Sequence, residues 1–365
     1  MSESSHAIPD NPEAITAAWL TAELASVAPG TKARSVEVVD AHSGTTGRAR
    51  LRVTWEGGDL PREVFAKLAP TDPMQRAMAV DTGMGAREAR FYREVACDVP
   101  VRVPNPLWSR WTDDRRAYIM LLEDLASSGC EFPTFRTGAD RAVAQSVMEG
   151  FARLHAAFWE SPRFGGDLSW IEPPMYSELG PELVKLGVAQ FGAEQPEAFH
   201  DMAQVYTENG AAVAGRLEAG PRTLLHGDGH LGNMFLDRGT VGFLDWACVS
   251  RGPGLRDVAY FLCNSLDTEF RRAEQDALLR RYLEVLAGGG APAPTFDEAW
   301  RDYRRFVASG WVAAVATYAV GDRMQAVEVG RRAVARANAT VEDLQTAALL
   351  REELGLPARQ RGSLP

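Results

Sequence analysis

Three side chains with oxygen donors, Asp228, Asn233 and Asp245, are the residues of this sequence best suited to chemistry. The first two lie in the stretch HGDGHLGN and follow the pattern H-x-D-x-x-x-x-N, and the third follows a later apolar stretch. Carboxylate and amide oxygens are hard ligands suited to Mg²⁺, which usually keeps some waters and binds through one or two carboxylates plus phosphate oxygens. The pattern therefore favours chemistry on a metal-bound phosphate.

The flanking sequence predicts how these side chains are held. Two leucines before His226 read as the end of a strand. A short hairpin follows, with strands at 234–236 and 241–244 and an Asp-Arg-Gly turn at 237–239. This ribbon would place Asp245 at the end of its second strand.

The same residues resemble the catalytic loop and the metal-binding strand of the kinase superfamily. The closest likeness is to its small-molecule branch: aminoglycoside phosphotransferases, choline kinases and the ecdysteroid-kinase-like group. In that branch the loop reads H-G-D-x-H-x-x-N, and the later metal Asp is followed by Trp, as in Asp245-Trp246, rather than by Phe-Gly. The resemblance implies that Asp228 is the catalytic base and that Asn233 and Asp245 hold Mg²⁺.

A metal-dependent hydrolase is a different interpretation of this stretch. His226, Asp228 and His230 alternate, so they could face one way on a strand and bind a transition metal. A two-His-one-carboxylate iron site needs a further His well separated in sequence, and no His follows His230. Gly227 and Gly229 also suit a loop better than a strand. Both observations favour the kinase-like interpretation.

A strand, a Gly-bearing turn and a second strand are predicted near the N-terminus, over 36–39 and 49–55. This is the layout of a kinase phosphate-covering loop, in which glycines let backbone N–H groups approach phosphate oxygens. A hairpin with Gly in its turn is also common without any ligand. The nucleotide-binding candidates of this turn are Ser43, Gly44, Thr45 and Thr46.

Residues 62–69 read as a third strand, with Lys67 among apolar neighbours. A strand Lys is usually solvated, but this one follows the Gly-bearing hairpin. In kinase-like folds, the Lys at this place contacts the nucleotide phosphates and pairs with a helix Glu. The E-x-x-F-Y arrangement that starts at Glu88 resembles the partner helix of the ecdysteroid-kinase-like group. Glu88 is therefore the expected partner, and Glu94 is the alternative.

Residues 117–122 form a continuous apolar run, as expected of a strand buried on both faces. The run ends at Glu123-Asp124-Leu125. In the resembling branch, the backbone around such an L-E-D-L sequence meets the adenine edge, which makes Glu123 and Leu125 nucleotide-binding candidates. Without the resemblance, the same residues would describe only a buried strand that ends in an acidic turn.

The chain beyond about residue 126 is predicted to be mainly helical. Apolar residues repeat every three to four positions over 140–159, and Asp140 is placed to cap this helix. Residues 251–254 are expected to form a loop before a helix that contains Asp257. The resemblance implies that Asp257 supports the catalytic loop through hydrogen bonds, although it could equally be a charge stabilised at a helix N-terminus. The further helices are expected at 267–287, 296–320 and 323–355.

The length of the chain indicates how many domains these elements form. A chain of 365 residues is long enough for about two domains, expected over 13–125 and 126–355. With these elements, the resemblance implies an α+β, two-lobe protein-kinase-like fold, with a small antiparallel-sheet lobe and a large helical lobe. The four Cys residues form no C-x-x-C pair, which is typical of reduced thiols.

Net charge and the distribution of apolar residues indicate which classes of partner to expect. A net charge of −10 gives no general basic footprint for nucleic acid. No run approaches the roughly 18 apolar residues of a membrane helix, and the polar N-terminus lacks an apolar signal segment. We therefore expect no nucleic acid and no membrane partner, and a cytoplasmic protein.

The expected function is Mg²⁺-dependent transfer of the γ-phosphoryl group of ATP or GTP to a hydroxyl of a small molecule. Positioning and electrostatics can carry this reaction. A nucleotide-binding regulatory pseudokinase is one alternative, but it need not keep Lys67, Asp228, Asn233 and Asp245 together. An aminoglycoside-modifying resistance kinase is another.

The acceptor is expected to be a neutral or partly apolar alcohol, because the tail 356–365 contains Arg and no acid. An aromatic stripe that includes Trp300, Trp311 and Tyr318 is mainly typical of core packing. One or two of its rings could instead contact the acceptor.

Overall fold

The computed structural model describes residues 7–44, 46–133, 138–174, 176–321 and 326–358. Thr45 of the predicted phosphate loop and the end of the tail, 359–365, lie outside these residues. The chain divides into two compact units. The first contains Met1–Glu131, Phe235–Arg238 and Gly242–Val249, and the second contains Phe132–Met234, Gly239–Val241 and Ser250–Pro365. The domain boundary expected at residue 125 stays a prediction.

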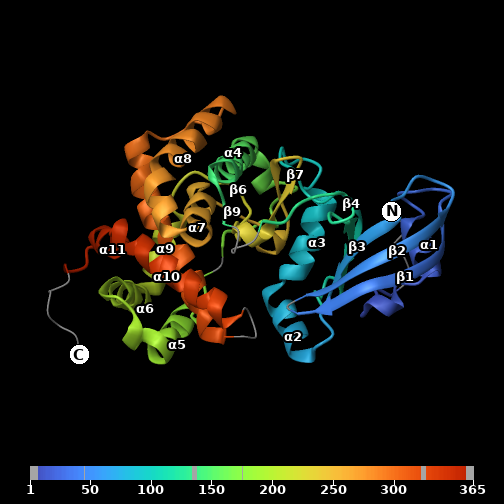
Figure 1. Cartoon of the computed structure of the whole chain (residues 1–365), viewed down its shortest axis with the longest axis horizontal. Coiled ribbons are helices and arrows are strands. Elements are labelled where there is room, and N and C mark those ends of the chain that lie inside the picture. Colours follow the sequence, from blue (N-terminus) through green and yellow to red (C-terminus); the bar gives the residue numbers. More distant parts are fainter. Residues whose placement is uncertain (1–6, 45, 134–137, 175, 322–325, 359–365) are drawn as a thin grey trace. The chain divides into compact units, whose positions relative to one another are not determined.

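The first unit is built on a five-stranded antiparallel sheet in the order β1-β2-β3-β5-β4 (Figure 1). Its strands are β1 (Lys32–Ser43), β2 (Gly47–Glu56), β3 (Glu63–Leu68), β4 (Pro106–Trp111) and β5 (Tyr118–Glu123). The strands predicted from sequence are present. The sequence analysis missed β4, an edge strand that begins with Pro, because its mixed polar and apolar residues lack a clean alternation.

Alternation along these strands gives the sheet two different faces. One face, with Leu51 on β2 and Ala66 on β3, packs with helix α1 (Ala17–Leu24) in an apolar core. The opposite face carries Arg48 and Lys67, which the strand register sets directly opposite one another. The other helices of this unit are η1 (Pro12–Ala14), α2 (Pro73–Thr82), α3 (Met84–Glu94) and η5 (Trp246–Cys248).

The second unit is mainly helical. Its long helices are α4 (Arg141–Ala157), α5 (Leu179–Phe191), α6 (Glu197–Glu218), α7 (Leu255–Ser265), α8 (Thr268–Gly288), α9 (Phe296–Val320), α10 (Val327–Asp343) and α11 (Thr346–Leu354). Its short helices are η2 (Pro162–Gly165), η3 (Gly192–Glu194) and η4 (Leu231–Asn233). Asp140 caps α4 as predicted, because its side chain accepts a hydrogen bond from the backbone N–H of Val143. The predicted α+β fold class is confirmed.

Two details of this unit differ from expectation. Part of the loop expected over 251–254 belongs to strand β9 (Ser250–Gly252), which pairs antiparallel with β6 (Thr223–Leu225). A strand of three residues is too short to show periodicity in sequence. The prediction of a single helix over 323–355 is also wrong. Gln345 adopts a left-handed φ of 53° and separates α10 from α11.

The predicted ribbon is present as a two-stranded sheet of β7 (Met234–Asp237) and β8 (Thr240–Phe243). Its turn contains Arg238 and Gly239, both with positive φ. This is the short hairpin expected before Asp245, and its second strand ends one residue earlier than predicted.

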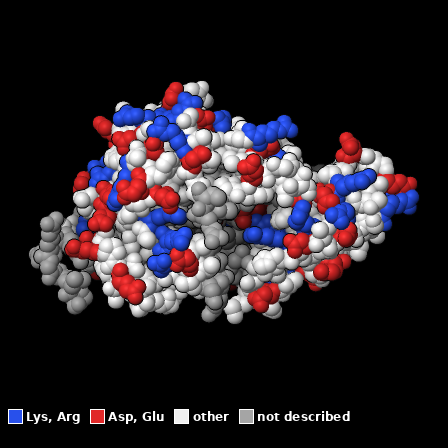
Figure 2. Space-filling view, viewed as in Figure 1, with Lys and Arg blue, Asp and Glu red and all other residues white. Residues whose placement is uncertain are grey.

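Charged side chains of both signs are interspersed on the face of the molecule shown in Figure 2. Elsewhere in the described chain such side chains form pairs; for example, Arg331 and Arg332 both contact Glu328, at 2.9 and 2.8 Å. Exposed pairs of this kind contribute only about 0–1 kcal/mol each. Among the helices within the described ranges, none is both long and apolar enough to cross a membrane.

Candidate active site

Lys67 lies at the centre of a charged cluster in the first unit. Strand β3 places its Nζ 2.5 Å from Glu88 Oε2 on α3 and 2.9 Å from Asp245 Oδ1. Lys67 and Glu88 are both buried. Glu94, the alternative partner, lies further along α3 and pairs with Arg90 at 2.8 Å. The structure therefore brings Lys67, Glu88 and Asp245 together and leaves Glu94 outside the cluster.

Two carboxylates share the single Lys67 ammonium. Burial acts to lower the pKa of Lys67, but attraction from Asp245 and Glu88 outweighs it and raises that pKa above its usual value. Burial raises the pKa of Glu88 to about 7, with Lys67 opposing the rise and Asp245 adding to it. The two carboxylates therefore hold Lys67 in its charged form.

Asp245 owes its position to the residue that follows it. Trp246 is buried and stacks on Phe91 of α3, with ring centroids 4.1 Å apart and planes 10° apart. The same helix carries Glu88, so this stacking fixes Asp245 beside the Lys67–Glu88 pair. Asp245 itself has φ 62° and ψ 65°, a left-handed conformation that Asp tolerates better than most residues. The Asp-Trp pair thus combines the predicted Mg²⁺ ligand with the ring that anchors it.

Arg48 is a member of this cluster that the sequence analysis missed. Its Nη2 lies 3.8 Å from Asp245 Oδ2. The sequence signal that could have found it is the alternation of residues along β2, which puts Arg48 on the polar face of that strand. The register with β3 then sets Arg48 directly opposite Lys67. A second cation therefore faces the carboxylate that is predicted to bind Mg²⁺.

The predicted phosphate loop is the turn between β1 and β2. Ser43 pairs with Gly47 across the hairpin, and the Gly44 N–H donates to the Thr46 carbonyl at 3.1 Å. The Ser43 hydroxyl also contacts the Thr71 hydroxyl at 3.2 Å. These bonds shape the turn at the end of the strands that carry Arg48 and Lys67, and its contact with phosphate stays a prediction.

The predicted hinge follows β5. The Glu123 carboxylate binds the Arg102 guanidinium through both of its oxygens, at 2.7 and 2.8 Å. Leu125 is buried in a small cluster with Cys130 and Phe235. Both side chains are thus engaged within the protein, so a nucleotide contact at the hinge would have to use the backbone, as expected.

In the second unit, the loop that is predicted to be catalytic is held by Asp257 on α7. One carboxylate oxygen of Asp257 accepts the N–H of His226 at 2.7 Å, and the other accepts the N–H of Gly227 at 3.0 Å. His155 of α4 adds a contact from its Nε2 at 3.4 Å. Burial acts to raise the pKa of Asp257, but hydrogen bonding and attraction from His155, aided by His226, lower it. These are the hydrogen bonds that the resemblance implied for Asp257.

Asp228 is flanked by Gly227 and Gly229, and at each position the local geometry favours glycine over other residues. Gly227 has a φ of 82°, in the left-handed region that favours glycine. At Gly229, a Cβ atom would come within 2.6 Å of the Phe151 ring. The G-D-G sequence therefore lets the loop turn sharply beside α4.

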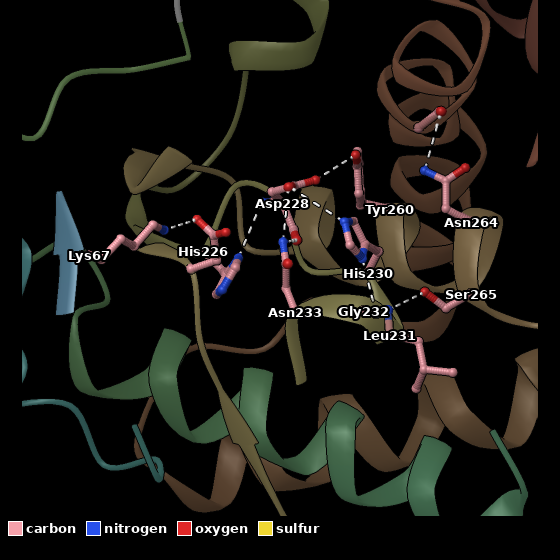
Figure 3. A network of polar contacts seen from close by, with 12 residues as sticks. Lys67, His226, Asp228, His230, Leu231, Gly232, Asn233, Tyr260, Asn264 and Ser265 are labelled. Atoms are coloured by element: carbon pink, nitrogen blue, oxygen red, sulfur yellow. Dashed lines mark hydrogen bonds and ion pairs between the residues drawn. The ribbon is translucent and has the colours of Figure 1, made fainter. Parts of the chain in front are cut away.

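The Asp228 carboxylate is held through both of its oxygens (Figure 3). Oδ1 accepts a hydrogen bond from the Tyr260 hydroxyl at 2.7 Å, and Oδ2 accepts one from the Asn233 amide at 3.0 Å. The side chain is still 32% exposed, and each carboxylate oxygen can accept more than one hydrogen bond. Asp228 is thus fixed in place and able to accept a further donor.

Tyr260 is the second residue of the candidate site that the sequence analysis missed. It lies on α7 three residues after Asp257, so both side chains project from one face of the helix. That spacing would have placed it beside the loop that Asp257 holds. Helix α7 therefore supports the backbone of the loop and the carboxylate of Asp228.

The geometry does not favour the hydrolase interpretation. The Nδ1 atoms of His226 and His230 accept backbone N–H bonds from Asp228 at 3.3 Å and from Gly232 at 3.0 Å. In the part of the chain that the structure describes, no three His, Cys, Asp or Glu side chains are grouped to hold a metal ion. The two histidines instead shape the loop around Asp228.

The aromatic stripe of α9 is mainly core. Trp311 is fully buried, and its Nε1 donates to Asn338 at 2.8 Å. Trp300 and Tyr318 are only partly buried. Of the three rings, only those of Trp300 and Tyr318 therefore keep exposed surface.

Loss of the Asp257 carboxylate should destabilise the protein. In Asp257→Ala, the buried N–H of His226 and the partly buried N–H of Gly227 lose their acceptor, which should cost about 2–6 kcal/mol of unfolding free energy. Because the folded-state pKa of Asp257 is lowered, its contribution is complete above its unfolded pKa of about 4 and is lost as pH falls through the folded pKa. Urea unfolding at several pH values should show this difference, with the exposed Asp276→Ala on α8 as control. A stability equal to that of the control at pH 7 would contradict this role.

Comparison with known proteins adds two findings. A family model described as "Phosphotransferase enzyme family" matches residues 37–300. No curated protein matches the chain.

Solved structures agree on the fold. Choline kinase from Cryptosporidium parvum Iowa II aligns at 10% identity over 88% of this chain and 91% of its own, with a TM-score of 0.51. The GDP complex of wild-type aminoglycoside 2'-phosphotransferase-IIIa aligns at 13% identity over 90% and 99%, with a TM-score of 0.50. At such identities the likeness concerns the fold, which is the two-lobe kinase-like one.

Proposed function

Because the chain belongs to the phosphotransferase enzyme family and is a small-molecule kinase, we propose that it transfers the γ-phosphoryl group of ATP or GTP to a hydroxyl of its acceptor. The observation that carries the proposal is the cluster of Lys67, Glu88 and Asp245, three residues far apart in sequence that meet within 3 Å contacts. A strand Lys paired with a helix Glu, together with an Asp that holds Mg²⁺, is the arrangement that protein kinases use for the nucleotide phosphates.

The residues present fit Mg²⁺. Asp245 and Asn233 each offer a hard oxygen donor of the kind that Mg²⁺ prefers. When bound, Mg²⁺ would neutralise charge that develops on the phosphates. Lys67, with Arg48 as a second cation, would contact phosphate oxygens, while Glu88 keeps the Lys67 ammonium in place. The turn at 43–46 would add backbone N–H groups.

Asp228 would orient the acceptor and take its proton. The acceptor oxygen forms a bond to the γ-phosphorus while the bond from that phosphorus to the bridging oxygen of the nucleoside diphosphate breaks. The hydroxyl proton passes to the Asp228 carboxylate, whose oxygens Tyr260 and Asn233 hold at 2.7 and 3.0 Å. A carboxylate fixed in this way needs little reorganisation during transfer.

We expect a nucleoside triphosphate to bind only with a divalent cation. Without one, the negative triphosphate would have no metal ion to hold it beside the Asp245 carboxylate, and Lys67 and Arg48 are already paired with that carboxylate. Calorimetry with ATP and with GTP, in Mg²⁺ and in EDTA, checks this. Equal affinity without metal, or no binding of either nucleotide, would rule the requirement out.

Substitutions of Glu88 and Glu94 on the same helix serve as test and control for the Lys67 contact. Glu88→Gln removes the charge that holds Lys67 and should raise the KM for nucleotide about ten- to hundredfold, since small misplacements are costly in positioned reactions. Glu94→Gln alters only the pair with Arg90 and should leave KM unchanged. Steady-state kinetics compare the two, and equal effects would mean that Glu88 has no special role.

We propose a neutral or partly apolar alcohol as acceptor and the cytoplasm as the location, since both ATP and Mg²⁺ are available there. The acid-free tail that motivated this acceptor falls largely outside the described residues, so its support rests on the partly buried Trp300 and Tyr318. A panel that includes choline, aminoglycosides and apolar alcohols compares these acceptors directly. Turnover of aminoglycosides alone would overturn the acceptor class and keep the reaction.

A further inference from the structure

We propose that Arg50, held by Asp124, is the residue on which the base of the bound nucleotide stacks. This inference rests on the proposed function and extends it to one side chain that neither the motifs nor the site geometry has used. It follows from three features of the first unit: the sheet register, the contacts of the Arg50 guanidinium, and the charges that surround it.

The register places Arg50 between the phosphate cluster and the hinge. Arg48 lies opposite Lys67 on β3, which lies opposite Met120 on β5. Two residues further on, Arg50 lies opposite Phe65 on the same face of the sheet, because side chains two apart share a face. Two residues span about 7 Å of strand. A nucleotide with its phosphates at Lys67 would therefore bring its base to the level of Arg50.

The next strand places the hinge at the same level. Phe65 lies opposite Leu122 on β5, and β5 ends at the following residue, Glu123. The backbone from Glu123 to Leu125 is the predicted contact for the edge of the base. Arg50 would thus cover a face of a base whose edge meets the hinge.

Asp124 fixes the Arg50 guanidinium. Its buried carboxylate accepts Arg50 Nε at 2.8 Å and the Ser127 hydroxyl at 3.0 Å through one oxygen. Its other oxygen accepts the Ala126 N–H at 3.1 Å. Arg50 Nη2 also donates to the Ser127 hydroxyl at 3.3 Å. Because these guanidinium bonds lie near the plane of the group, they hold the plane and leave its flat faces for stacking.

Charge indicates a base rather than a phosphate at this position. The Arg50 charge is already balanced by Asp124. The Lys67 cluster, which is the proposed phosphate site, lies two residues further along the same face. The Arg50 side chain keeps 37% exposure, and its strand neighbour Phe65 is partly exposed as well. A planar guanidinium beside a partly exposed ring suits a flat π system, with which Arg stacks favourably.

Arg52 provides a matched control. It is the next residue on this face of β2, but it pairs with Glu63 at 2.9 Å and Glu37 at 3.1 Å and is 51% exposed. It lies one step beyond the level of the hinge. Removing Arg52 changes the net charge by the same amount as removing Arg50.

The test is calorimetry of wild type, Arg50→Ala, Arg50→Lys and Arg52→Ala with Mg²⁺ and three probes: ATP, GTP and inorganic tripolyphosphate. Both Arg50 variants should weaken binding of ATP and GTP about tenfold and leave tripolyphosphate binding unchanged. Arg50→Lys keeps the charge and loses the plane, so it separates stacking from electrostatics. Arg52→Ala should match wild type with every probe.

Tripolyphosphate binding also shows that each variant is folded. Unchanged nucleotide affinity in both Arg50 variants would overturn the inference. An equal loss with nucleotide and tripolyphosphate would overturn it too, because Arg50 would then act on the phosphates. If wild type binds tripolyphosphate and nucleotides equally well, no base site exists and the inference fails while the phosphate site stands. If wild type binds none of the probes, the proposed function itself fails.

Discussion

Asp228→Asn should abolish phosphoryl transfer and leave nucleotide binding almost unchanged. The substitution keeps the size of the side chain and removes the carboxylate that accepts the acceptor proton. A positioned general base contributes about 10²–10⁴-fold, so kcat should fall by about a thousandfold. Initial-rate assays of nucleoside diphosphate formation, together with calorimetry of Mg²⁺–nucleotide binding, measure the two effects separately.

Asp276→Asn is the matched control, because it makes the same chemical change at an exposed position on α8. It should behave as wild type in both assays. An Asp228→Asn enzyme with a wild-type rate would remove Asp228 from the role of base. A loss of transfer that merely follows a loss of nucleotide affinity would contradict the separation of roles.

Asp245→Asn should weaken nucleotide binding and transfer together. This carboxylate is the predicted charged ligand of Mg²⁺, and it also contacts Lys67 at 2.9 Å and Arg48 at 3.8 Å. Substitution of groups that merely support metal ligands costs about 10–100-fold in affinity or activity, and loss of a ligand should cost at least as much. Calorimetry with ATP in Mg²⁺ should show this loss, and in EDTA the variant should differ little from wild type.

The comparison of Asp228 and Asp245 distinguishes their proposed positions in the reaction. If Asp245→Asn bound Mg²⁺–nucleotide as tightly as wild type, the metal would have to be held elsewhere. The Asp245→Asn variant should stay folded, because Glu88 remains beside Lys67 at 2.5 Å and the stacking of Trp246 on Phe91 does not involve the carboxylate. Circular dichroism checks this expectation.

The sequence allowed much of the Lys67 cluster to be predicted. The E-x-x-F-Y pattern predicts Glu88 rather than Glu94 as the partner of Lys67, and the structure shows why that pattern is informative. The Phe of the pattern, Phe91, lies three residues after Glu88 and stacks on Trp246. One helix face therefore carries both the Lys67 partner and the ring that anchors the Asp-Trp pair, and local spacing is enough to find it.

Contacts made by alternation across strands, or between a loop and a helix, were harder to predict. Arg48, Arg50 and Arg52 read in sequence as one alternating basic strand, yet each meets different carboxylates. Only the register with β3 distinguishes them, and register depends on long-range pairing. Tyr260 was missed for a related reason: its hydroxyl bonds to Asp228, 32 residues earlier in the chain.

Product analysis with labelled nucleotide tests the central claim most directly. The protein is incubated with Mg²⁺, γ-labelled ATP or GTP, and the panel of hydroxyl compounds, and the products are separated by mass spectrometry. The account predicts that at least one compound gains one labelled phosphoryl group at a hydroxyl for each nucleoside diphosphate formed, and that Asp228→Asn forms none. Tight Mg²⁺-dependent nucleotide binding with no turnover in the presence of any compound, or with water, would contradict it and identify a regulatory pseudokinase.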